Sequence, residues 1–116
     1  MKKLLLTLGL SILSAGAWAA CSNSKSSLET QKCLNLAVGQ LKHELDEVLK
    51  AASESTNAQK ELKTAQIKWL AYKESQCGDF VVADAQGSPA TIVVDLVCQA
   101  DLYKERINFL KSYFNQ

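Results

Sequence analysis

The chain has 116 residues, including 13 lysines and arginines and 12 aspartates and glutamates, which gives a formal net charge of +1. This length fits one small domain rather than several. A charge balance so close to neutrality predicts no basic face, which argues against nucleic acid as a partner.

Residues 1–19 have the pattern of a secretory signal peptide. Two lysines precede an apolar run over residues 4–13, and the sequence Ala-Trp-Ala at 17–19 supplies a small-x-small cleavage site. The apolar run is too short to span a bilayer, and no second one follows. We therefore expect cleavage after residue 19 or 20 and export of one domain, residues 20–116, to the periplasm. Without the two lysines, the exported part has 11 basic and 12 acidic residues, a net charge of −1.

The four cysteines, Cys21, Cys33, Cys77 and Cys98, all follow the predicted cleavage site. An even number in a small exported domain indicates two disulfides. No C-x-x-C spacing is present and His43 is the single histidine, so the sequence predicts no metal site and no cofactor. Three pairings are possible. Pairing in sequence order, Cys21–Cys33 and Cys77–Cys98, closes short loops and suits the helix layout below.

Cys21 also has a competing interpretation, because a bacterial lipoprotein carries its lipid on a cysteine at this place. The residue three places upstream is Trp18 rather than an aliphatic residue. Lipidation would also leave an odd number of cysteines. The sequence therefore favours a disulfide at Cys21 over a lipid anchor.

Two amphipathic helices are predicted first. One spans about 27–52, begins with a capping box formed by Ser26 and Glu29, and has an apolar stripe at steps of three and four. The stripe consists of Leu34, Val38, Leu41, Leu45 and Val48. The second spans about 57–76, where Leu62, Ala65, Trp69 and Tyr72 share a face. Trp69 is the expected anchor of the core.

Residues 78–90 are expected to form the one long connection. Gly78 suits a helix C-terminus, Phe80 and its neighbours suit a short extended piece or a lid, and Gly87 permits a sharp turn. Ser88 before Pro89 is typical of a helix start. The third helix, about 89–113, has a stripe of Val93, Leu96, Ala100, Tyr103, Ile107, Leu110 and Phe114. The predicted fold class is all-α, a small antiparallel three-helix bundle stapled by two disulfides.

No set of catalytic residues is predicted. His43 lies among charged residues and is interpreted as solvent-facing, and the carboxylates fall at spacings typical of a solvated helix surface. Arg106 lies next to the core stripe. We expect its stem to run along the bundle and its guanidinium to reach a carboxylate or a carbonyl of a neighbouring segment.

The order of these motifs resembles the LprI-like family of exported bacterial domains. The central match is Leu62-x-x-Ala65-Gln66-x-x-Trp69-x-x-Tyr72-x-x-x-x-Cys77, preceded by Cys21 and Thr30-x-x-Cys33 and followed by Gly87-Ser88 and Cys98-x-x-x-Leu102-x-x-x-Arg106. The match covers about residues 21–110. Two departures are Tyr103, where the family usually has threonine, and the stretch 44–49, which lacks the usual Leu-Asn pair and aromatic residue.

The resemblance implies a helical, disulfide-bonded domain and suggests inhibition of a lysozyme. The leading hypothesis is a periplasmic inhibitor or binding protein, not an enzyme, whose partner is a lysozyme or another cell-wall hydrolase. The candidate partner-binding residues are Asp79, Phe80, Asp84, Gly87 and Ser88, and the family-motif residues interpreted as packing are Gln66, Trp69, Tyr72 and Arg106. The alternative is an envelope binding or immunity protein that acts on another wall-degrading enzyme or complex.

Overall fold

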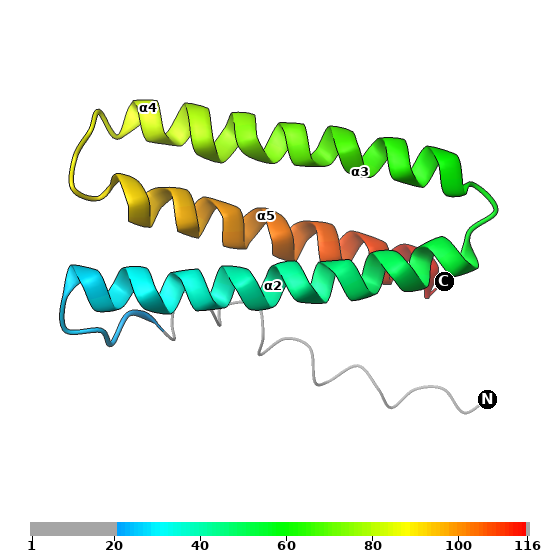
Figure 1. Ribbon diagram of the computed structural model, residues 1–116, viewed down its shortest axis with the longest axis horizontal. Coiled ribbons are helices and arrows are strands. Elements are labelled where there is room, and N and C mark those ends of the chain that lie inside the picture. Colours follow the sequence, from blue (N-terminus) through cyan, green and yellow to red (C-terminus); the bar gives the residue numbers. More distant parts are fainter. Residues whose placement is uncertain (1–20, 116) are drawn as a thin grey trace.

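The computed structural model describes residues 21–115, so the predicted signal peptide lies outside the described residues. Three antiparallel helical rods make up the domain (Figure 1). The first is α2, Ser27–Ser55, and the third is α5, Thr91–Phe114. The second rod, residues 59–84, joins α3 (Gln59–Lys73), the π-helix η1 (Glu74–Val81) and the short α4 (Val82–Asp84). Because the described chain contains no strand, the predicted all-α fold is confirmed.

Both disulfides follow the pairing in sequence order. Cys21 is bonded to Cys33 of α2, with 5.6 Å between their Cα atoms. Cys77 of η1 is bonded to Cys98 of α5, with 5.5 Å between their Cα atoms. The first bridge ties the start of the described chain to α2, and the second ties the second rod to α5.

The core lies between α2 and α5. Its larger cluster contains Leu45, Tyr103, Ile107 and Leu110, each at most 3% exposed. The second cluster contains Cys21, Leu34 and Leu96 around the first disulfide. The predicted stripes of both helices are thus confirmed at the positions that lie in these clusters. Full burial of one leucine side chain is worth roughly 1.5–3 kcal/mol, so these residues provide most of the driving force for packing.

α5 lies between α2 and the second rod, so the domain is flat, measuring 51 × 33 × 19 Å along its principal axes (Figure 1). No residue of α3 is fully buried. Trp69 is only half-buried at the margin of the larger cluster, with its ring centroid 5.4 Å from that of Tyr103. Tyr72 is 53% exposed. The expected packing of Trp69 is therefore present, although at the margin of the core rather than at its centre. The expectation that Tyr72 packs is wrong, because its side chain is exposed.

The predicted long connection over 78–90 is also wrong in its first half. The helix continues through Gly78 as the π-helix η1 and ends at Asp84. A π-turn holds more residues than an α-turn, which changes the direction in which later side chains point. Cys77 lies inside this segment, is 1% exposed and is covalently bonded to α5. The expected extended piece at residues 80–82 is therefore helical, and it closely follows the cysteine that attaches this rod to α5.

The actual connection is residues 85–90. Gln86 and Gly87 have φ angles of 54° and 70°, in the left-handed region, so the predicted sharp turn at Gly87 is confirmed. Ser88 Oγ accepts a hydrogen bond from the Ala90 backbone N–H at 3.1 Å, and the Thr91 hydroxyl donates to the Ser88 carbonyl at 2.7 Å. The predicted capping chemistry of Ser88 is therefore present, although regular helix begins two residues later than expected.

The start of α2 agrees with the prediction more closely. Ser26 is its N-cap, and its hydroxyl accepts from the Glu29 backbone N–H at 3.2 Å. The helix runs three residues further than expected, to Ser55. The Thr56 hydroxyl then accepts from the Ala58 backbone N–H, which shapes the short turn into α3.

Among residues 21–115, no helix combines the length and the hydropathy that a bilayer crossing needs.

Candidate functional site

The described residues do not assemble a hydrolytic site around the single histidine. His43 Nε2 lies 3.6 Å from a Glu47 carboxylate oxygen, and both side chains are at least 70% exposed. The two residues are one helical turn apart on α2, which confirms the solvent-facing interpretation of His43. Within the described range, no three histidine, cysteine or acidic side chains come together in a way that could hold a metal ion.

The predicted partner-binding residues divide between two elements. Asp79, Phe80 and Asp84 lie on the helical end of the second rod, whereas Gly87 and Ser88 lie in the turn that follows. Phe80 is 59% exposed although it is a large apolar residue. Its segment is joined to α5 by the bond from Cys77. π-helical segments within helices often occur at functional sites, because they reorient side chains locally. The structure thus presents an exposed aromatic residue, flanked in sequence by two exposed carboxylates, on a segment attached to α5.

Tyr72 adds a second exposed aromatic side chain, near the end of α3 and one turn before Gln76. Sequence reasoning assigned it to packing because it shares a helical period with Leu62 and Trp69. A weaker signal was available, since the hydroxyl of a tyrosine needs a polar partner or water. Its exposure makes Tyr72 a candidate contact residue.

Two family-motif positions from different rods meet each other. Arg106 of α5 donates from Nε to Gln66 Oε1 of α3 at 3.0 Å. Arg106 thus reaches a neighbouring helix as expected, but its acceptor is the side-chain amide oxygen of Gln66 rather than the expected carboxylate or loop carbonyl. The Arg106 guanidinium also lies 6.0 Å from the centroid of the Phe109 ring. Its buried Nη2 has no hydrogen-bond partner among the described residues, and burial lowers the pKa of Arg106. An arginine nevertheless stays protonated at neutral pH, so this contact carries a partly desolvated positive charge.

This pairing gives a stability prediction. We expect Gln66→Leu to lower the free energy of unfolding by about 1–2 kcal/mol, because Arg106 Nε then joins Nη2 in lacking an acceptor. The double variant Gln66→Leu/Arg106→Met removes the charge with its partner and keeps the volume, so it should lie within about 1 kcal/mol of the wild type. Urea unfolding measures both. A double variant less stable than the single variant would contradict this interpretation.

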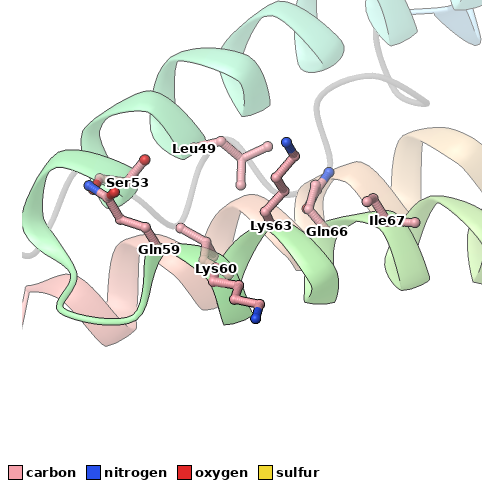
Figure 2. Close-up of a pocket in the computed structure, with 8 residues that line it drawn as sticks. Leu49, Ser53, Gln59, Lys60, Lys63, Gln66 and Ile67 are labelled. Carbon is pink, nitrogen blue, oxygen red and sulfur yellow. The ribbon is translucent and has the colours of Figure 1, made fainter.

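A groove of about 590 Å³ lies between the end of α2 and the first half of α3 (Figure 2). Sequence reasoning missed it, because it results from the way α3 diverges from the α2–α5 pair. Leu49 and Ser53 line it from α2, and Figure 2 shows the Lys63 side chain of α3 pointing toward Leu49 and the Lys60 side chain pointing the other way. The other lining residues are Gln59, Lys60, Leu62, Gln66 and Ile67. Gln59 Nε2 closes one end by donating to the Ser53 carbonyl at 2.7 Å.

The fold and the two disulfides place the chain in the class of small, covalently stapled helical domains. It belongs to the family described as Lysozyme inhibitor LprI, whose model matches residues 19–110. Neither the comparison with curated proteins nor the comparison with solved structures finds a match. One departure from the family motif now has a structural role, because Tyr103 is 3% exposed and fills the core beside Trp69.

Proposed function

We propose that this protein is a non-catalytic inhibitor that binds a lysozyme. The observation that carries the proposal is the family match, which covers residues 19–110 and therefore includes the described core and both disulfides. The exposed aromatic residues on the second rod support a protein partner, because aromatic side chains supply much of the binding energy at protein interfaces.

The part of the surface proposed to meet the enzyme is the acidic end of the second rod with its turn. Asp79 and Asp84 are both exposed and flank Phe80 in sequence. Lysozymes are commonly basic, so these carboxylates favour association by long-range attraction, and Phe80 supplies an apolar contact. The disulfide at Cys77 holds the segment in place before binding. Such preorganisation reduces the entropy lost on docking, which is how small inhibitors bind tightly.

The test uses the mature, disulfide-bonded protein at a molar excess over each of several lysozyme types, with lysis of cell-wall substrate as the readout. We expect inhibition of at least one of them and a loss of inhibition of about tenfold or more in Phe80→Ala. The matched control is Phe109→Ala, since Phe109 of α5 is 58% exposed against 59% for Phe80. Undiminished lysis by every lysozyme would refute the proposal. Equal losses of inhibition in the two variants would show that the contact with the enzyme does not depend on Phe80.

A second candidate function is binding to another wall-degrading enzyme or to an envelope complex. The exposed apolar side chains of α3, Ile67 and Leu70, suit any protein partner equally. Capture of one stoichiometric partner from a periplasmic extract, together with undiminished lysozyme activity, would favour this function.

We also propose that the chain acts in the periplasm after removal of residues 1–19. Two disulfides are typical of an oxidising compartment. The Cys21 sulfur is bonded to Cys33, which supports a protein without a lipid at this position.

A further inference from the structure

α3 has an exposed stripe on the side that borders the groove, and the other described residues leave this stripe largely uncovered. Lys60, Lys63, Ile67 and Leu70 follow one another at steps of three, four and three, which places them on one side of the helix. Both lysines are exposed, and Ile67 and Leu70 are 59% and 43% exposed. We call these four residues the α3 stripe. Three of them, all except Leu70, also line the groove beside α2 (Figure 2).

The charge on the second rod is separated along its length. α3 carries four lysines and one glutamate, whereas the remaining residues, 74–84, carry three acidic residues and no basic one. Neither Lys60 nor Lys63 forms an ion pair or a hydrogen bond with another described residue. Their charges are therefore uncompensated within the described chain, although the exported part as a whole has a net charge of −1.

Further positive charge lies behind this surface. Gln66 lines the groove and accepts a hydrogen bond from Arg106, whose buried Nη2 lacks a partner among the described residues. Leu49 and Leu62 make part of the groove wall apolar. A surface that combines free cations with apolar side chains favours an occupant that carries carboxylates and can exclude water around them.

We propose that the α3 stripe docks at the carboxylate-lined cleft of the lysozyme, with Lys60 and Lys63 facing the acidic residues there. This inference rests on the proposed function and names the surface that would block the enzyme. A glycoside hydrolase requires a pair of carboxylic side chains at its reacting centre, so its cleft offers the opposite charge. α3 is about 22 Å long at 1.5 Å per residue, enough to lie along such a cleft. The acidic end of the same rod then meets the basic surface around it.

The first experiment reverses both charges of the stripe with Lys60→Glu/Lys63→Glu. We expect at least a roughly hundredfold weaker inhibition, since two cation–carboxylate contacts become repulsive. The matched control is Lys42→Glu/Lys50→Glu on α2, where both lysines are exposed and the change in net charge is identical. This control should lose no more than about threefold, the part due to long-range attraction. Equal melting temperatures for the two variants establish that both are folded.

The second experiment pairs Lys63→Met with a lysozyme whose catalytic carboxylates are replaced by amides. Binding is measured by calorimetry, because the enzyme variant has no activity to inhibit. We expect Lys63→Met to weaken binding to the unmodified lysozyme about tenfold and binding to the amide variant less than about twofold. An equal loss against both enzymes would overturn the proposal.

Three outcomes distinguish a failure of this inference from a failure of the proposed function on which it rests. If the wild-type protein binds no lysozyme, both fail. If it inhibits a lysozyme and Lys60→Glu/Lys63→Glu inhibits equally well, the docking surface is elsewhere and only the inference fails. If the unbound protein is a dimer and that double variant makes it monomeric, the stripe is a contact between copies of this chain, which also overturns the inference.

Discussion

Replacing Cys77 and Cys98 together by alanine is expected to lower the free energy of unfolding by about 3 kcal/mol and to abolish the proposed inhibition of lysozyme. The bridge spans 21 residues, and without it the unfolded chain gains conformational freedom. A loss of this size lowers the melting temperature of a domain this small on the order of 15 °C. Function is lost for a separate reason, because the bridge attaches the segment that carries Phe80 to α5. Thermal unfolding and the lysis assay measure the two effects.

Replacing Cys21 and Cys33 by alanine provides the matched control for this prediction. That bridge spans 12 residues, so its removal costs a similar free energy of about 3 kcal/mol. It lies on α2, and its loss leaves the second rod attached. We therefore expect the control variant to keep its inhibition at temperatures where both variants are folded. Equal loss of inhibition in both variants would show that the bridge at Cys77 has no role beyond general stability.

The second large effect is expected at Leu45, where substitution by alanine should lower the free energy of unfolding by about 2–5 kcal/mol. Leu45 is 2% exposed and lies in one cluster with Tyr103, Ile107 and Leu110. Its removal leaves a cavity between α2 and α5, and the rigid packing of these two helices allows only partial collapse. Chemical unfolding followed by circular dichroism measures the change.

Leu36 supplies the control for Leu45. It lies on the same helix, α2, and is 70% exposed. Leu36→Ala makes the same chemical change and the same change in helix propensity, and it should cost less than about 0.5 kcal/mol. Similar losses at the two positions would contradict a core placed between α2 and α5.

The sequence was sufficient for the parts of the fold that depend on local pattern and covalent chemistry. The stripe of α2 includes Leu34 and Leu45, and the stripe of α5 includes Tyr103, Ile107 and Leu110, all of which are buried. Each of these long apolar stripes needs another apolar surface to cover it, so the packing of α2 against α5 follows from the helical periodicity of the sequence. The order of the cysteines along these helices favoured the pairing that the structure has.

The second rod could not be predicted in the same way. Its period is helical like that of the other rods, but a period does not reveal how much apolar surface remains for a third helix to cover. Trp69 and Tyr72 therefore looked equally buried, although Trp69 packs against the core and Tyr72 is exposed. Gly78 looked like a helix end, because the low helix propensity of one glycine is visible in sequence whereas the π-helix that continues through it is not.

The candidate site also depends on how the helices pack in three dimensions, which the sequence does not show directly. Phe80 and its flanking carboxylates were identified by composition, although they were placed on a loop rather than on a helix. The contact between Gln66 and Arg106 joins residues 40 positions apart in the chain, and the groove joins the end of α2 to the first half of α3. No local pattern links such residues, and only the observed angle of α3 to the α2–α5 pair brings them into one surface.

The absence of any fully buried residue in α3 has a thermodynamic consequence. A ligand that covers this helix would bury side chains that the isolated domain leaves exposed. Occupancy would then be coupled to conformational stability, and the unfolding equilibrium would depend on the concentration of the bound species. The protein would be most resistant to heat and proteolysis while it is engaged with its target.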